Sequence, residues 1–202
     1  MCSNMPPLEL AIQFHGHISP DLLMGVRVAE FALKQLQVDH DESDDLLAIV
    51  ENVSGGVDAI QSILGCTLGK GNLIVKDKGK FVYTIASRNK NTAIRIAQHY
   101  NALKTPVMEN FYRCADSINP TAAQTSEYEM LLGQVFEFIM TSNFDDLFKW
   151  DKIEDFSFPA PAAKHKPILP CSVCAEGVME VHAARTEEKV LCPDCKISLG
   201  GK

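Results

Sequence analysis

The sequence predicts an α+β core with one mixed sheet, joined by a short linker to a small zinc-held tail. Helical and strand-like segments interleave along residues 1–156, a pattern that favours a sheet packed against helices. Residues 157–169 are rich in proline and alanine, which is typical of an extended linker. Residues 170–202 are too few to bury a core of their own and hold four clustered cysteines.

The first predicted elements are a helix over residues 20–36, a buried strand over 46–50 and a short helix over 57–64. In the long helix, apolar residues recur at helical spacing, and Ser19 suits the N-cap because a proline follows it. Consecutive apolar residues predict the buried strand. Gly65 is a suitable end for the short helix.

The second half of the core is expected to hold a hairpin, a strand and a long helix. Apolar runs flank an Asp-Lys-Gly turn within residues 72–85, which is the pattern of a β-hairpin. Residues 93–97 suit either a strand or a helix, and their alternating isoleucines favour a strand. Ser126 and Glu129 have the spacing of a capping box, which predicts a second long helix after them.

Two C-x-x-C pairs separated by 17 residues have the spacing of a tetrahedral four-thiolate zinc site. The predicted ligands are Cys171, Cys174, Cys192 and Cys195. Zinc is the default metal for such a set, and the alternative is a pair of disulfides. An odd number of cysteines remains, which a reducing compartment tolerates as free thiols: Cys2, Cys66 and Cys114.

The composition predicts a soluble globular protein, since 46% of the 202 residues are hydrophobic and 22% are charged. The first residues lack a targeting pattern, and no segment has the length and apolar character of a membrane span. We therefore expect a cytoplasmic protein without membrane association. The net charge of -7 argues against a general nucleic-acid binder, which would present a basic face.

Four residues of the core are candidates for chemistry: His15, His17, Asp58 and Cys66. In an extended backbone, the two imidazoles would point to one side and address one ion or one substrate; the alternative is a hydrogen-bonded structural pair. Asp58 opens a helix, where it either belongs to an anion-friendly site or is simply stabilised by the helix dipole. Cys66 is either a metal ligand or nucleophile, or a small buried residue.

Several motifs of this chain occur in the order found in one protein family. They are Phe14-His-Gly-His-x-x-Pro20, Gly25-x-Arg27, Val57-Asp-Ala-Ile-Gln61, Gly65-Cys-Thr-Leu-Gly-Lys-Gly-Asn-Leu73 and the segment from the first C-x-x-C pair to Arg185. On these residues the chain resembles the family of the FmdE subunit of formylmethanofuran dehydrogenase. The resemblance implies a core related to the catalytic-domain fold of glyceraldehyde-3-phosphate dehydrogenase, a homodimer and a C-terminal zinc finger.

The family's name associates it with the molybdenum or tungsten enzyme that captures carbon dioxide as formylmethanofuran. The resemblance thus implies one-carbon metabolism and such a redox enzyme as a partner, although many members have no assigned reaction. Three positions depart from the family's usual pattern: cysteine is usual where this chain has Ser19 and Gly55, and glycine where it has Asp21. If the family's core site uses those thiols, this chain either keeps a mixed nitrogen, oxygen and sulfur set, suited to zinc, iron or nickel, or has lost a core metal.

The leading hypothesis is a metal-binding protein of this family, with structural zinc in the tail and a metal or small-ligand site at the His-Gly-His loop. Neither the reaction nor the identity of a second metal is assigned. The alternative is a non-catalytic binding or regulatory module, whose zinc finger docks a protein or nucleic acid while the core serves as a dimerisation platform. A third hypothesis is a scaffolding component of a larger redox complex.

Overall fold

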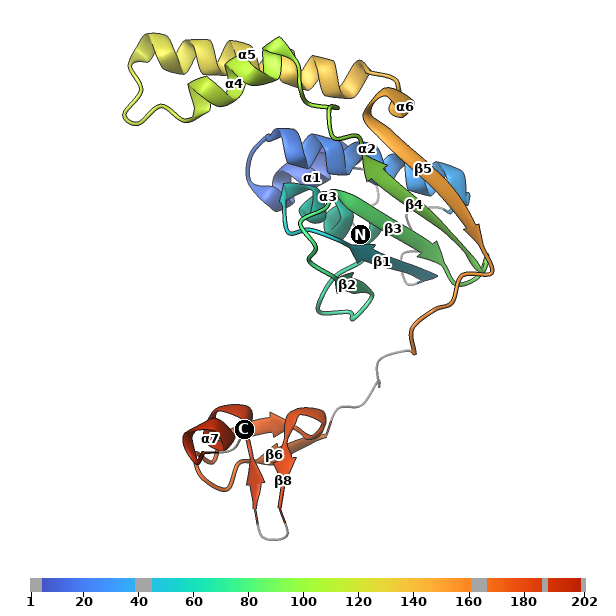
Figure 1. The fold of residues 1–202 in the computed structure, drawn as a ribbon, viewed down its shortest axis with the longest axis vertical. Helices are drawn as coiled ribbons and strands as arrows, with labels where there is room; N and C mark the ends of the chain where they lie inside the picture. The colour runs from blue at the N-terminus through green and yellow to red at the C-terminus, as the bar shows by residue number, and fades with distance from the viewer. Residues whose placement is uncertain (1–4, 39–44, 161–166, 187–188, 201–202) are drawn as a thin grey trace. The chain divides into compact units, whose positions relative to one another are not determined.

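The computed structural model describes residues 5–38, 45–160, 167–186 and 189–200. The chain divides into two compact units, residues 1–158 and 159–202, which we describe separately (Figure 1). Cys2 and residues 161–166 of the predicted linker lie outside the described residues. Within the described ranges, no helix has the length and apolar character needed to cross a membrane.

The larger unit is built from helices on one side of a sheet. The helices are α1 (Pro7–His15), α2 (Pro20–Leu36), α3 (Gly55–Leu64), α4 (Pro106–Ala115), α5 (Ala122–Thr141) and α6 (Phe144–Leu147). The strands are β1 (Leu46–Val50), β2 (Leu73–Val75), β3 (Val82–Ser87), β4 (Thr92–Gln98) and β5 (Phe148–Glu154). The predicted bounds of α2 and β1 are confirmed, residues 93–97 form a strand as favoured, and α3 begins two residues before its predicted start.

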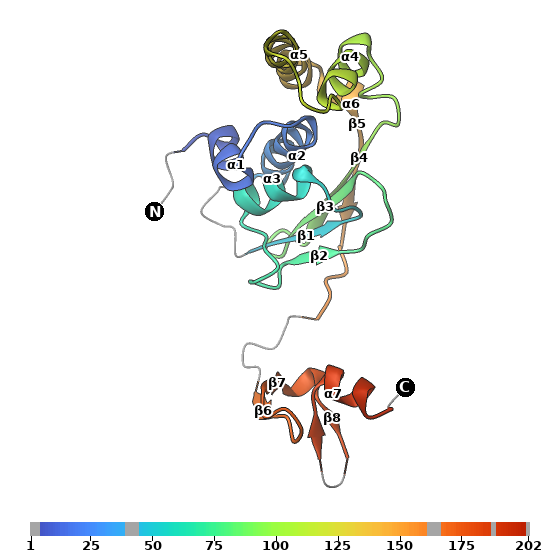
Figure 2. The same ribbon diagram turned by 90° about the vertical axis from the view of Figure 1, so that its left-hand side faces the viewer.

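The sheet has the strand order β2-β1-β3-β4-β5, in which β1 and β2 are parallel and all other neighbours are antiparallel. The expected α+β core with one mixed sheet is therefore confirmed. Figure 2 shows α1, α2 and α3 together on one side of this sheet, with the α4–α5 pair beyond them. No sequence pattern had indicated α1, α4 or β5.

The predicted hairpin over residues 72–85 is wrong, because its two strands do not pair with each other. β2 and β3 lie on opposite sides of β1, and each hydrogen-bonds to it. The connection between them passes around the end of β1, where Lys78 N and Lys80 N donate to Glu51 O at 2.9 and 3.0 Å. The Asp-Lys-Gly turn is therefore part of a longer connection that leads from β2, on one side of β1, to β3 on the other side.

The predicted capping box of the second long helix is also misplaced. α5 begins four residues before Ser126, and its capping box is formed by Thr121 and Gln124. The Thr121 side chain accepts from Gln124 N at 3.3 Å, and the Gln124 side chain accepts from Thr121 N at 2.9 Å. Thr121 and Gln124 also have the residue types of a capping box, and the pattern by itself does not show at which pair the helix begins.

The sheet carries apolar contacts on both faces. The main core lies between the sheet and the helices and contains fully buried side chains of α2, α3, β1, β3 and β4. On the other face, Leu47, Ala86 and Ala93 form a smaller cluster against which Phe156 and Phe158 pack. Arg88 lies over the Phe158 ring at 4.8 Å. Phe158, assigned from sequence to the linker, thus packs on the core.

The tail is a small unit of short elements. Its strands pair as two antiparallel ribbons, β6 (Ile168–Pro170) with β7 (Gly177–Met179) and β8 (Ala184–Arg185) with β9 (Val190–Leu191). A turn of 3₁₀ helix, η2 (Glu180–His182), connects the two ribbons, and α7 (Pro193–Ser198) ends the described chain. Among the tail residues that the structure describes, the buried cluster consists of Cys171, Val178 and Cys192, so most of it belongs to the predicted zinc site.

Candidate metal centre and core pocket

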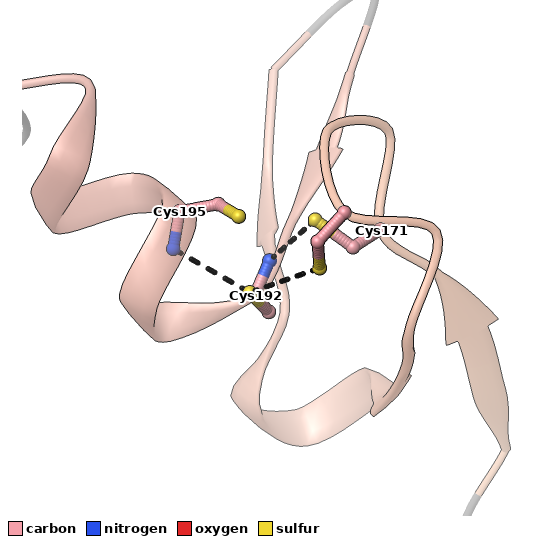
Figure 3. Close-up of side chains that lie close together, drawn as sticks. Cys171, Cys192 and Cys195 are labelled. Atoms are coloured by element: carbon pink, nitrogen blue, oxygen red, sulfur yellow. Dashed lines mark hydrogen bonds between the residues drawn. The ribbon is translucent and has the colours of Figure 1, made fainter.

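The four tail cysteines come together from the two turns predicted to carry them. Cys171 follows β6, and Cys192 caps α7, which also carries Cys195 (Figure 3). The four Sγ atoms lie within 4.8 Å of one another, and those of Cys174 and Cys192 are 3.9 Å apart. All four are free thiols, so the disulfide alternative is not what the structure has.

The geometry of this cluster fits a zinc site. Four sulfurs bound to zinc at ~2.3 Å form a tetrahedron with edges of roughly 3.8 Å, so the observed cluster needs only a slight contraction. Backbone N–H groups already point at sulfur: Cys192 N donates to Cys171 Sγ and Cys195 N to Cys192 Sγ, both at 3.4 Å. Such hydrogen bonds, chiefly with the Cys174 backbone, lower the pKa of Cys171 to about 6, which favours one thiolate before any metal arrives.

In the core, His15 and Asp58 form a direct pair. His15 is the last residue of α1 and Asp58 lies in the first turn of α3, and His15 Nδ1 is 2.7 Å from Asp58 Oδ2. Gln61 donates to the other carboxylate oxygen at 3.3 Å. Because a carboxylate accepts, the neutral imidazole holds its proton on Nδ1 and leaves the lone pair of Nε2 available for a ligand or a proton.

The two histidines are neighbours, but for a different reason from the one predicted. The backbone between them is not extended: Gly16 ends α1 in the left-handed conformation, with φ 97°. The His15 and His17 ring centroids lie 4.7 Å apart. A glycine turn therefore brings the rings together, and only glycine adopts this conformation without strain.

Ser19 and Gly55 lie at the free edge of the His15 ring. A Cβ atom on Gly55 would be 3.3 Å from His15 Nε2 and 3.3 Å from Ser19 Oγ. The nearest atom to such a Cβ would be His15 Cε1 at 3.1 Å, so the glycine lets the start of α3 approach His15 and Ser19 closely. We call this place of close approach the notch. Ser19 Oγ also caps α2 by accepting from Leu22 N at 3.3 Å, as predicted.

Further polar groups surround this notch that the sequence did not indicate. The Tyr83 hydroxyl reaches the start of α3 from β3, where it hydrogen-bonds with Ser54 and Asn52. A side chain on Gly56 would clash with this hydroxyl. Burial raises the pKa of Tyr83, and burial also raises the pKa of Asp21 despite the nearby His15. Tyr83 is distant in sequence from α3, so only the fold brings it here.

Cys66 does not share the exposure of the other three candidates. Its side chain is fully buried, and this burial raises its pKa to about 12, so the thiol is protonated at neutral pH. Among the described residues, the tail cysteines are the only group of three or more histidine, cysteine or acidic side chains close enough to share an ion. The core residues, as they stand, do not form a closed metal site.

A helix-covered mixed sheet, together with a tail folded around four cysteines, defines a two-unit α+β protein with a four-cysteine site in its tail that fits a metal ion. A family model described as "FmdE, Molybdenum formylmethanofuran dehydrogenase operon" matches residues 14–149, more than half of the chain. The chain therefore belongs to the FmdE family, as the sequence motifs predicted.

Two of the similar proteins show how far this likeness extends. A crystal structure of a tungsten formylmethanofuran dehydrogenase FmdE-like protein from Syntrophus aciditrophicus superposes with a TM-score of 0.64 and 20% identity, covering 96% of this chain and 92% of that one. At this identity the likeness concerns the fold. A probable S-adenosyl-L-methionine-binding protein of Archaeoglobus fulgidus is 40% identical over 90 residues, 43% of this chain. The chain spans only 25% of that relative's length.

Proposed function

We propose that this FmdE-family protein holds a structural zinc in its tail and binds a small ligand at the His15–Asp58 pair. The observation that carries the second part is the 2.7 Å hydrogen bond between the two side chains, which directs Nε2 toward the notch at Gly55. A closed four-thiolate site has no open coordination position for a substrate. Ligand chemistry is therefore assigned to the core and metal-dependent folding to the tail.

For the tail, zinc holds together a unit with almost no apolar core. Bound metal supplies the free energy of folding that such small units lack. Cys192→Ser should reduce the zinc content to well below one per chain and unfold the tail, while the core keeps its stability. Metal analysis by mass spectrometry and the dispersion of tail amide signals in NMR spectra measure the two effects. A core that unfolds together with zinc loss would contradict the division of roles.

For the core, S-adenosyl-L-methionine is the first ligand to test, because the Archaeoglobus fulgidus relative is named as probably binding it. We expect its addition to shift the amide signals of residues 15–19 and 54–58, and His15→Ala to weaken the effect. The matched control is His182→Ala, since His182 is exposed in the tail. Shifts elsewhere, or shifts that persist in the His15 variant, would count against the proposed site.

A more specific form of this proposal is that the core binds a second metal ion. His15, His17 and Asp58 supply nitrogen and oxygen donors, but they would need a further donor or a rearrangement to enclose an ion. Metal analysis distinguishes the versions. A stoichiometry above one per chain that falls in a His15→Ala/His17→Ala double variant supports a core metal, and a stoichiometry of one that does not change contradicts it.

Other expectations, from the sequence itself or from the family resemblance, stay predictions. They are a homodimer, a molybdenum or tungsten redox enzyme as partner, a role in one-carbon metabolism, a cytoplasmic location and the likeness to the catalytic domain of glyceraldehyde-3-phosphate dehydrogenase. The catalytic roles of four core residues also stay predictions: His15, His17, Asp58 and Cys66. Sedimentation of the full chain, and co-purification with a molybdenum- or tungsten-containing enzyme, test the first two.

A second candidate function is a binding module without catalysis, and one observation favours it. Several large apolar side chains of the tail are exposed and do not contribute to its small buried cluster. Each of the following is at least 43% exposed: Ile168, Val173, Met179, Val181, Ile197 and Leu199. Exposed apolar residues on a rigid unit suit a protein partner. A cross-linked partner whose capture is lost in Val181→Ser, with zinc content unchanged, would support this function.

A further inference from the structure

A second hollow lies at one end of the sheet's strands, where β3 begins and β4 ends. Its volume is about 360 Å³, and it is lined by Lys80, Phe81, Val82, Gln98, His99 and Tyr100. The pairing of β3 with β4 fixes its walls, since Gln98 N donates to Phe81 O at 2.9 Å. None of these residues contributes to the notch at His15, so a ligand here would occupy a different site.

Two aromatic rings in the hollow are open to solvent. Tyr100 is 86% exposed and Phe81 is 38% exposed. An aromatic ring left in water costs free energy that a flat partner recovers by stacking on it. Neither ring belongs to the apolar clusters of the fold, so their exposure is not explained by packing.

Two lysines give the same hollow a positive charge. Lys80 lines it, and Lys104 Nζ lies over the Tyr100 ring at 4.5 Å from its centroid. In the ranges that the structure describes, neither lysine forms an ion pair, whereas nearby Lys78 pairs with Glu51 at 3.2 Å. In a chain with a net charge of -7, two lysines beside two exposed rings form a local site for an aromatic anion.

We propose that this hollow binds a nucleotide, with the base on Tyr100 and Phe81 and the phosphate between Lys80 and Lys104. Its volume lies at the lower end of the ~300–1,000 Å³ range of small-molecule sites, which suits a mononucleotide. Base stacking on aromatic side chains combined with lysine–phosphate contacts is also how single-stranded nucleic acid is held. Both sources present the same chemistry, a base carrying a phosphate, and the experiment separates them.

The test follows amide signals of the full, zinc-loaded chain by NMR during titration with AMP, with adenosine and with a single-stranded oligonucleotide. AMP should shift the amides of residues 80–82 and 98–104, adenosine should bind more weakly, and added salt should reduce the affinity for AMP. Tyr100→Ala should weaken AMP binding about tenfold, as expected for loss of a stacking platform. Because Tyr100 is so exposed, this variant should fold normally.

Matched controls are Tyr112→Ala and Lys152→Gln, which remove a half-exposed tyrosine and an exposed lysine elsewhere and should leave AMP binding unchanged. Lys104→Gln should weaken binding and lessen its salt dependence. Binding of the oligonucleotide but not of AMP would support the site and assign it to nucleic acid. If neither ligand shifts these amides at millimolar concentration, or if Tyr100→Ala leaves the shifts intact, the inference is overturned.

Discussion

The close approach of α2 and α3 can be tested by giving Gly25 a side chain. A Cβ atom at this position would lie 2.5 Å from both Cα and O of Gly56 and 2.9 Å from Ala59 Cβ. Because two of these atoms belong to the backbone of α3, no side-chain rotation can make room. The 2.5 Å contacts are about 0.9 Å short of the 3.4 Å at which ordinary van der Waals contact begins, so Gly25→Ala must push the helices apart.

The size of the effect follows from two opposing contributions. Alanine is favoured over glycine within a helix by about 1 kcal/mol, while overpacking of a rigid core typically costs about 1–3 kcal/mol and sometimes more. The clash is with backbone, so the upper end of the cost, about 3 kcal/mol, applies, and we expect a net loss of about 2 kcal/mol. Gly133 in α5 is the matched control, because a Cβ there meets nothing within 4 Å. Gly133→Ala should stabilise by about 0.5–1 kcal/mol.

Urea denaturation followed by tryptophan fluorescence measures both variants. The chain has one tryptophan, Trp150, and it lies in β5, so its signal reports unfolding of the larger unit alone. We expect the urea midpoint of Gly25→Ala to fall and that of Gly133→Ala to rise, with unchanged slopes. Equal midpoints for Gly25→Ala and the unmodified chain would refute the claim that the two helices require glycine at their contact.

Three further predictions concern single sites in the core. Arg27→Met should cost about 2–3 kcal/mol in urea denaturation, because the guanidinium donates to three carbonyl groups at the end of α5 at 2.5–3.0 Å; Arg27→Lys should recover only part of this loss. Burial raises the pKa of Asp21 above 3.8, so its ionisation costs stability, and Asp21→Asn should raise the free energy of unfolding at pH 7 but not below pH 3.8. A Ser19→Cys/Gly55→Cys double variant should gain one metal ion per chain in metal analysis, since the new thiols would meet at His15 Nε2; an unchanged metal content would contradict this reading of the notch.

Local sequence patterns predicted the elements whose signals are local. The bounds of α2 followed from Ser19 at the N-cap and from helical spacing of apolar residues, and Gly65 ends α3 with φ 62° as expected. The four cysteines of the predicted zinc site could be identified from sequence equally well, because each C-x-x-C pair is a single turn. The pairing partner of β2 could not be predicted in this way, since a strand pattern does not show which strand will pair with it. The hairpin prediction failed because the chain places β1 between its two halves.

The residues around the notch show the same limit. His15, His17 and Asp58 were identified as single residues, but the His15–Asp58 pair spans 43 positions and depends on the packing of α1 against α3. Tyr83 carried no signal at all, because its hydroxyl meets Ser54 and Asn52 only after β3 has paired with β1. Contacts of this kind arise from tertiary packing, which periodicity and capping patterns do not encode.

The motifs that identify the family divide into two groups once their contacts are known. Gly25, Arg27 and Cys66 have sufficient structural reasons: a helix contact, the end of α5 and a buried thiol. Packing alone therefore accounts for these three residues, whatever the chemistry. His15 and Asp58 instead converge at the notch formed by Ser19 and Gly55, the two positions at which the family resemblance implies cysteines. Shared motifs thus establish common ancestry of the fold, while any change of function between this chain and other members is expected at that one notch.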